Sequence, residues 1–268
     1  MQLAHRVSLG GVQLDSLDER IIIKGIEGGA GKDTVTAVAT GAGDGTRITG
    51  MRRESVEIQV RFSMNIRRDS LAEREEVLEA INAWAAAIPA YLRINYKPNR
   101  RLYVDEIVTP GEGDIWKRLS EYTIVFRAHA IPYWQENTEN TAATRTGQTG
   151  SGTILQAGSA EAPANIELAN KSGALINTAS VTVNGHTMSF EQLALAANES
   201  LVTDHTVSKG KNVIRIRIRS AQDSYRSVMA KRTDGSADEL MLSPGECAFS
   251  FSAQRACVMT VTSRGRFR

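Results

Sequence analysis

A glycine-rich stretch is the first place where this sequence could do chemistry. The run Gly28-Gly29-Ala30-Gly31-Lys32-Asp33-Thr34 follows an apolar segment, as a phosphate-binding loop does. The pattern fails twice, because Ile26 stands where the first glycine belongs and Asp33 stands where a magnesium-binding hydroxyl residue must follow the lysine. No helical pattern follows that could direct its N-terminus at phosphate groups. We therefore predict a flexible loop here and no nucleotide site.

The histidines do not have the spacing of a catalytic or metal-binding group. They stand singly in the sequence: His5, His129, His186 and His205. None has a second histidine, a cysteine or a carboxylate three or four residues away on a predicted helix, the spacing that makes a ligand pair. The sequence also lacks the Gly-x-Ser-x-Gly turn that presents a nucleophilic serine. We predict that the protein is not an enzyme and that it binds no cofactor and no metal ion.

The two cysteines are predicted to be core residues. Cys247 and Cys257 lie in alternating apolar segments, which predict strands. A hairpin that turns near Gln254 would not place the two cysteines opposite each other. We favour two small buried side chains over a disulfide or a metal-binding pair.

Three arginines alternate with isoleucines in the segment from Val213 to Arg219. In a strand, Arg215, Arg217 and Arg219 would lie on one face at intervals of about 6.6 Å. Such a row could follow phosphates or an acidic partner, or it could be a solvated face whose charges discourage edge-to-edge aggregation. Because no aromatic residue alternates with the arginines to stack on bases, we favour the solvated face, with a protein partner as the second interpretation.

The composition is typical of a soluble globular protein. Of the 268 residues, 41% are hydrophobic and 23% are charged, and the net charge is only +2. This balance gives no reason to expect binding to nucleic acid or to membranes. No apolar run approaches the roughly 18 residues of a membrane span. The first residues lack the apolar stretch of a secretory signal, so we expect synthesis and residence in a cytoplasm.

The first half of the chain combines strand patterns with one helix pattern. Between Val56 and Met64, apolar and polar residues alternate, which predicts a half-buried strand. Ser70 and Glu73 then form a capping-box pattern, and apolar residues recur at helical spacing as far as Pro89, which predicts one amphipathic helix at about 71–88. Further strands are predicted at 7–14, 20–26, 91–96, 101–108 and 116–130. A sheet with the helix packed across it is the economical architecture.

Residues 27–46 are rich in glycine, alanine and threonine. Residues 34–40 could pair as a strand within this stretch. The glycines on both sides instead favour an extended, mobile excursion from the first domain.

The second half is predicted to be a separate domain. Residues 135–152 are nearly all threonine, asparagine, glutamine, glutamate and glycine, which is too polar for a core, so we predict a linker there. Short strands without a helix follow, at 164–168, 180–183, 187–190, 201–204, 213–219, 247–251 and 257–261. This pattern predicts a sandwich or jelly roll. The domains are therefore 1–134, which contains all three tryptophans, and 153–268.

The order of these parts resembles the distal tail proteins of long, flexible-tailed bacteriophages, across nearly the whole chain. The segments that carry the resemblance include the strand at 56–64 and these motifs: Gly43-Asp44-Gly45-Thr46-Arg47, Glu73-Arg74-Glu75, Ile81-Asn82-Ala83-Trp84, Tyr91-Leu92-Arg93-Ile94, Arg101-Leu102-Tyr103-Val104 and Leu242-Ser243-Pro244-Gly245-Glu246. The last motif, followed by two apolar strands, looks like the family's final turn and strands. The resemblance implies a mainly β fold, in which an N-terminal β domain with one helix precedes a galectin-like jelly-roll sandwich.

The resemblance also implies a structural role in a phage or prophage. Members of this family form a hexameric ring at the virion tail tip, which connects the tail tube protein to the baseplate hub, tail fibre and receptor-binding proteins. The ring would assemble in the host bacterial cytoplasm, and DNA would only pass through its channel. The excursion at 27–46 is our candidate for an arm that reaches the neighbouring subunit, with Thr34, Val35, Thr36 and Val38 as candidate interface residues.

A carbohydrate-binding adhesin that acts through the C-terminal sandwich is the alternative function. Sugar sites on β-sandwiches commonly stack a sugar ring on an aromatic side chain. After the predicted linker there is no tryptophan, and Tyr225 is the single tyrosine. We therefore rank the structural role first.

Overall fold

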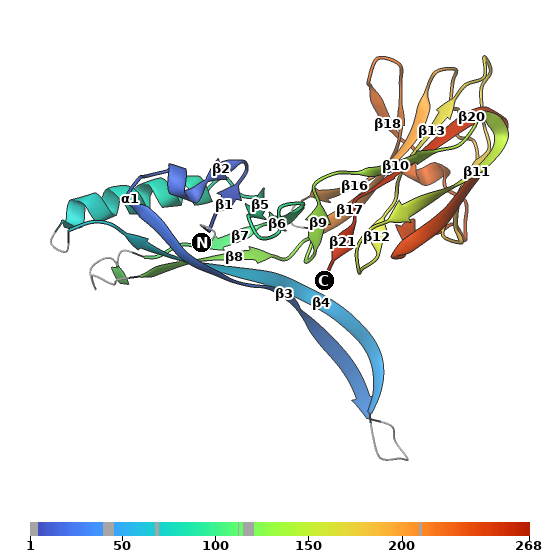
Figure 1. The fold of residues 1–268 in the computed structure, drawn as a ribbon. Coiled ribbons are helices and arrows are strands. Elements are labelled where there is room, and N and C mark those ends of the chain that lie inside the picture. Colours follow the sequence, from blue (N-terminus) through green and yellow to red (C-terminus); the bar gives the residue numbers. More distant parts are fainter. Residues whose placement is uncertain (1–4, 40–45, 68–69, 112, 115–120, 209–210) are drawn as a thin grey trace. The chain divides into compact units, whose positions relative to one another are not determined.

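The computed structural model describes residues 5–39, 46–67, 70–111, 113–114, 121–208 and 211–268, and the chain forms two compact units, 1–134 and 135–268. Figure 1 shows a mainly β chain that contains the helix α1 (Leu71–Ala85). Two single-turn 3-10 helices lie at Leu14–Ser16 and Met229–Lys231. The structure confirms the predicted fold class of β with one helix followed by a β-sandwich.

The first unit contains two sheets. One has the strand order β3-β4-β8-β7, and in the other β2, β1, β5 and β6 are neighbours. The strands are β1 (Val7–Leu9), β2 (Val12–Gln13), β3 (Ile21–Ala39), β4 (Thr46–Met64), β5 (Ala90–Ile94), β6 (Arg100–Val104), β7 (Glu106–Val108) and β8 (Tyr122–Ala128). The predicted strand at 116–130 is described only from residue 121, and its first residues lie outside the described part of the chain.

The helix α1 provides much of the core of this unit. Its buried face consists of Val77, Leu78, Ile81, Trp84 and Ala85, together with Arg74. This face packs on the β4–β8 layer, where the Trp84 and Phe126 rings meet edge to face with centroids 5.9 Å apart. Burial of each large apolar side chain stabilises the fold by about 1.5–3 kcal/mol.

The helix boundaries differ in two ways from the sequence prediction. Ser70 makes no capping hydrogen bond through its side chain, and the Glu73 carboxylate lies 3.9 Å from Arg20. The prediction of a capping box at Ser70 and Glu73 is therefore wrong. The helix also ends at Ala85 instead of residue 88, because the Ala87 amide bonds to the Trp84 carbonyl in a tighter final turn.

The chain changes sheets at Asp105, where the sequence predicts one strand across 101–108. The Asp105 carboxylate accepts hydrogen bonds from the amides of His129 (2.9 Å) and Ala130 (2.8 Å). The Asp105 amide also donates a hydrogen bond to the Arg127 carbonyl of β8. The chain thus passes between sheets at this residue, with β6 in one sheet and β7 in the other.

Over its described residues, the excursion predicted at 27–46 is a paired strand. The chain from Ile21 to Ala39 is one continuous strand, and it pairs antiparallel with β4 from Ile21↔Met64 to Ala39↔Thr46. The ladder contains four register shifts, one of them between Gly28 and Gly31. Glycine-rich sequence here indicates bulges in a paired strand.

The second unit is a β-sandwich around one apolar core, with the sheet order β15-β14-β20-β13-β16-β17-β18 and two further strands on β20. Its strands are β10 (Asn140–Ala143), β11 (Gly147–Gln156), β12 (Ala162–Pro163), β13 (Asn165–Asn170), β14 (Ala179–Val183), β15 (His186–Phe190), β16 (Ser200–Ser208), β17 (Lys211–Arg219), β18 (Tyr225–Ser227), β19 (Met241–Leu242), β20 (Gly245–Ser263) and β21 (Arg266–Phe267). Strand β9 (Trp134–Glu136) begins at the last residue of the first unit.

Strand β20 links the parts of the sandwich. Residues 245–253 pair with β11 and β14, whereas residues 257–263 pair with β13 and β10. The two strands predicted at 247–251 and 257–261 are therefore one strand of 19 residues, without a turn at Gln254. Both cysteines lie on it, buried and unbonded to each other.

The predicted polar linker at 135–152 is wrong, because most of it belongs to β10 and β11. Gly150 and Gly152 lie opposite Phe251 and Phe249 in the β11–β20 ladder. A Cβ atom at Gly150 would lie 2.5 Å from the Phe251 ring, and one at Gly152 would lie 2.7 Å from the Phe249 ring. The glycines thus leave space for aromatic rings supplied by β20, which a hydropathy pattern of β11 alone does not reveal.

Candidate assembly surfaces

Part of the β3–β4 hairpin is not covered by a third strand. Strand β8 pairs with β4 only from Val56 to Phe62. Before Val56, the described residues of β4 pair only with β3, and we call the described residues of 31–55 the arm. Figure 1 shows the two strands continuing past β8 as a curved ribbon. A paired ribbon of this kind presents its outer strand edges and both of its faces to other molecules.

The four candidate interface residues all lie on the β3 strand of the arm. Thr34, Val35 and Thr36 are exposed, and the Val35 side chain is 48% exposed. Val38 pairs with Arg47 in the ladder, and its side chain lies outside the described part of the structure. The ladder therefore brings these residues onto one strand, on which the three residues with described side chains are exposed.

The glycines at the base of the arm permit a close approach between segments. Gly28 and Gly29 have φ of +90° and +91°, which L-residues with side chains rarely adopt. A Cβ atom on Gly28 would lie 2.4 Å from the Glu57 carbonyl oxygen. On Gly29, a Cβ atom would lie 3.0 Å from Ile58 and 3.5 Å from Trp134. The stretch that resembles a phosphate loop is thus a bulge that packs against β4 and Trp134.

Arg53 fastens the arm to the rest of the first unit. Its side chain is only 6% exposed, and its Nε donates a 2.7 Å hydrogen bond to the Pro132 carbonyl. Its guanidinium lies 5.3 Å from the Tyr133 ring centroid and 3.4 Å from the Asp33 carboxylate. A Cβ atom on Gly31 would lie 2.2 Å from this guanidinium, so Gly31 provides the space that Arg53 occupies.

A row of paired side chains links the strands of the β4-β8-β7 layer on its polar face. Glu57 and Glu106 are both register partners of Arg127, which binds them at 3.0 Å and 2.7 Å. Hydrogen bonds from Gln59 and then Arg127 lower the pKa of Glu57. His129, at 2.7 Å, and then Arg127 lower the pKa of Glu106. The single Arg127 guanidinium thus bridges two carboxylates, and it holds three strands together on their polar side.

The arginine row predicted on β17 is partly neutralised by neighbouring strands. Arg217 lies 2.7 Å from Asp204 of β16 and 4.4 Å from the centroid of the Tyr225 ring. Arg219 is paired with Glu167 of β13. These carboxylates lie far from the arginines in sequence, so only the ladder register reveals the pairing. The arrangement agrees with the solvated-face interpretation.

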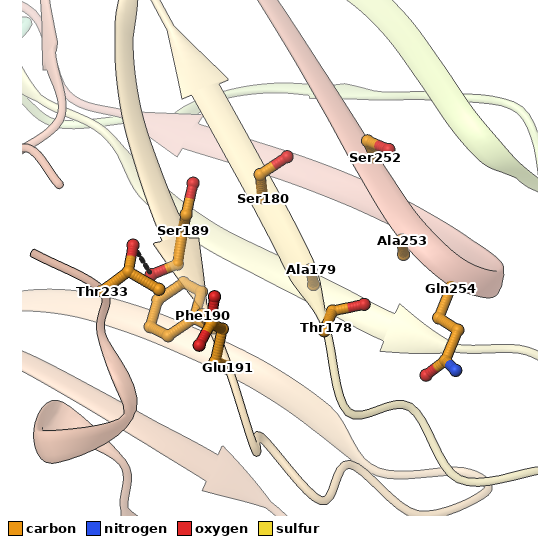
Figure 2. A pocket seen from close by; sticks show the side chains of 10 residues that line it. All are labelled: Thr178, Ala179, Ser180, Ser189, Phe190, Glu191, Thr233, Ser252, Ala253 and Gln254. Carbon is orange, nitrogen blue, oxygen red and sulfur yellow. Dashed lines mark hydrogen bonds between the residues drawn. The ribbon is translucent and has the colours of Figure 1, made fainter.

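A polar hollow of about 430 Å³ lies over β14, β15 and β20. Figure 2 shows its lining: Thr178, Ala179, Ser180, Ser189, Phe190, Glu191, Thr233, Ser252, Ala253 and Gln254. Ser189, Ser180 and Ser252 are consecutive register partners across the three strands. Phe190 is only 2% exposed, so the hollow offers hydroxyl, amide and carboxylate groups without an aromatic ring on which a sugar could stack.

The predicted chemistry-bearing residues are not brought together into one site. Among the described residues, no group of three or more His, Cys, Asp or Glu side chains is placed to hold a metal ion. Burial raises the pKa of the Cys257 thiol to about 11, which suppresses the reactive thiolate. No helix in the described part of the chain is long and apolar enough to cross a membrane.

Comparisons with known proteins reveal similarity at the level of the fold. No protein-family model and no curated protein sequence matches this chain. Among solved structures, the chain is similar to the crystal structure of the Dit protein of phage SPP1, described as a paradigm of the hub adsorption apparatus in phages that infect Gram-positive bacteria. The TM-score is 0.67 at 13% identity, over 98% of this chain and 99% of that one.

A second similar structure is a chain in the baseplate of phage P2, in its activated conformation with calcium. The TM-score is 0.50 at 6% identity, over 98% of both chains. Because the identities are low, these matches establish a shared fold. Both units of this chain therefore have the architecture found in the SPP1 Dit protein.

Proposed function

We propose that this protein is a distal tail protein of a long-tailed phage or prophage, and that it acts as a structural part of the tail tip. The observation that carries the proposal is the match to the SPP1 Dit protein over 98% of this chain and 99% of that one. A match confined to one sandwich would carry far less weight, because sandwiches serve many functions.

The protein forms a hexameric ring that connects the tail tube protein to the hub and receptor-binding proteins of the baseplate. A closed ring requires a heterologous contact, in which one patch meets a different patch on the next subunit. The first unit forms the ring, and the second unit is a galectin-like sandwich. The ring is assembled in the bacterial cytoplasm and is located at the tail tip of the finished virion. DNA passes through its channel. Because the net charge of the chain is only +2, its electrostatic attraction for the DNA phosphates is small.

The arm supplies part of this contact, because it is a long paired ribbon with exposed residues Thr34, Val35 and Thr36 and no covering strand. Its deletion tests this role. Thr34 and Arg52 are register partners, so replacing residues 35–51 with Asn-Gly closes the hairpin with a tight turn and keeps Arg53. We expect a monomer whose circular dichroism and cooperative melting match those of the wild type. An intact ring after the deletion contradicts a role for the arm.

Carbohydrate binding by the second unit is the second candidate function. It is favoured by the hollow over β14, β15 and β20, whose serine hydroxyls and Glu191 carboxylate could bind a polyol. The lack of an exposed aromatic ring in its lining argues for weak binding. Glycan-array binding by the full chain, lost in Glu191→Gln, would support this candidate. Silence across the array favours the scaffold alone.

A further inference from the structure

The outward face of β1, β5 and β6 carries positive charge. Strand alternation places Val7, Leu92, Ile94, Leu102 and Val104 in the core. The alternate residues point the other way, and they form the surface that we call the basic face: Arg6, Ser8, Tyr91, Arg93, Arg101 and Tyr103. The strands β1, β2, β5 and β6 contain no aspartate or glutamate. None of the six residues of the basic face is acidic.

The basic face has a defined shape. Arg101 stacks 3.8 Å from the centroid of the Tyr91 ring, and Tyr91 meets Tyr103 edge to face at 5.5 Å. Beside them, Arg6 and Arg93 border a hollow of about 200 Å³ that is also lined by Ser8. Tyrosine and arginine are the residue types enriched at the energetically dominant positions of protein interfaces.

The arginines of the basic face differ in their ion pairing from several other arginines of the same unit. Arg20, Arg53, Arg61 and Arg127 each lie within 4.0 Å of a carboxylate. The guanidinium groups of Arg6 and Arg93 make no ion pair with any residue that the structure describes. The two cations are therefore available to carboxylates supplied by another molecule.

The outer face of α1 carries the complementary charge. Glu75 and Glu79 are exposed and lie one helical turn apart, so their side chains are neighbours. Within the described part of the chain neither forms an ion pair, whereas Glu73 and Glu76 are turned toward Arg20. Both surfaces face away from the buried side of their own elements, so each is available to a second copy of the chain.

We propose that the basic face of one copy binds the Glu75–Glu79 face of α1 in the next copy. The two surfaces differ, so the contact is heterologous, as a closed ring requires. The Glu carboxylates bind Arg6 and Arg93, and the stacked Arg101, Tyr91 and Tyr103 provide a rigid, partly apolar platform beside them. This inference depends on the hexameric ring proposed above. It identifies the two surfaces that would join one subunit to the next.

Matched charge reversals test the contact. One variant carries Arg6→Glu and Arg93→Glu, and the other carries Glu75→Arg and Glu79→Arg. Each places like charges on both surfaces, so we expect the association measured by light scattering across a concentration series to weaken at least tenfold. An equimolar mixture of the two variants can alternate around a ring with every contact opposite in charge. The mixture, and a single chain with all four substitutions, should both regain the wild-type assembly.

The controls separate this contact from folding and from the ring itself. Arg255→Glu reverses an exposed arginine in the second unit and should leave assembly unchanged, and thermal melts should show that all variants fold. If the wild type forms rings and both charge-reversal variants form them equally well, this contact is contradicted and the proposed ring is not. Reversals that weaken assembly without rescue in the mixture or the combined variant also contradict it. A wild type that stays monomeric throughout contradicts the ring, and this contact with it.

Discussion

The indole nitrogen of Trp134 donates a 3.0 Å hydrogen bond to the carbonyl oxygen of Gly29. Trp134 is fully buried, and it lies against the bulge at which β3 bends into the arm. The glycines of this segment are therefore required by packing. The glycine-rich run that resembles a phosphate-binding loop therefore connects the sheet of the first unit to the arm.

Gly28→Ala tests this connection. We expect the free energy of unfolding to fall by about 2–4 kcal/mol, because a positive φ costs about 1–2 kcal/mol and the new Cβ atom would also strike the Glu57 carbonyl. Gly11→Ala is the matched control, since Gly11 has φ of +94° and open space around its Cβ position. Chemical denaturation should show a clearly larger loss for Gly28→Ala. Equal losses would mean that the close approach of β3 to β4 does not matter.

Arg53→Met should loosen the arm at its base. The substitution removes the donor to the Pro132 carbonyl in a site where the side chain is 6% exposed, at a cost of about 1–3 kcal/mol. Hydrogen exchange of the β3 and β4 amides beyond Gly31 should accelerate more than exchange in β8. Arg61→Met serves as the control, because the Arg61 side chain is 45% exposed. Uniform acceleration across the unit would contradict a local role.

His205 should make the second unit sensitive to acid. Burial, and then the positive charge of Arg266, lower the pKa of His205 to about 4, against the opposing effect of Asp204. The unfolded chain binds the proton first as the pH falls below about 6.5. Stability is therefore complete above that pH and declines between pH 6.5 and 4, by about 2–3 kcal/mol.

A substitution isolates this effect. His205→Gln should flatten the decline in the free energy of unfolding between pH 6.5 and 4, whereas His186→Gln, at an exposed position, should keep it. The measurement is urea unfolding at a series of pH values. An unchanged pH profile in His205→Gln would refute the assignment to this residue.

The cysteines should be inert in the folded protein. Burial raises the pKa of Cys257 to about 11 and also raises that of Cys247. At pH 8, alkylation by iodoacetamide should be at least about 100-fold slower in the native protein than in denaturant. Mass spectrometry after timed quenching gives the rates. Rapid native labelling of Cys257 would show that the end of β20 near it opens readily.

The sequence predicts well the elements whose hydrophobic pattern is complete within one segment of the chain. The strand around Val56 and Ile58 alternates because one of its faces is buried under α1, and the helix has an apolar stripe because only one side packs. The order of the two units, and the buried character of both cysteines, also follow from local pattern. None of these features depends on a distant partner.

The failures share one physical cause, which is that the deciding partner lies far along the chain. Gly150 and Gly152 look like linker residues until the rings of β20 occupy their missing side-chain space. Gly31 looks flexible until Arg53 fills the space beside it. The unneutralised Arg93 could not be recognised either, because ion pairs such as Arg217–Asp204 depend on which strands become neighbours.

The native mass of the purified chain decides whether this protein forms a hexameric ring. Light scattering behind a sizing column, over a range of protein and salt concentrations, measures it without a label. We expect a closed species of six times the chain mass of 29.2 kDa, or a stacked pair of such rings, which dissociates as salt is raised. A mass that remains that of one chain under every condition, or a closed dimer, would contradict the assignment to a tail ring.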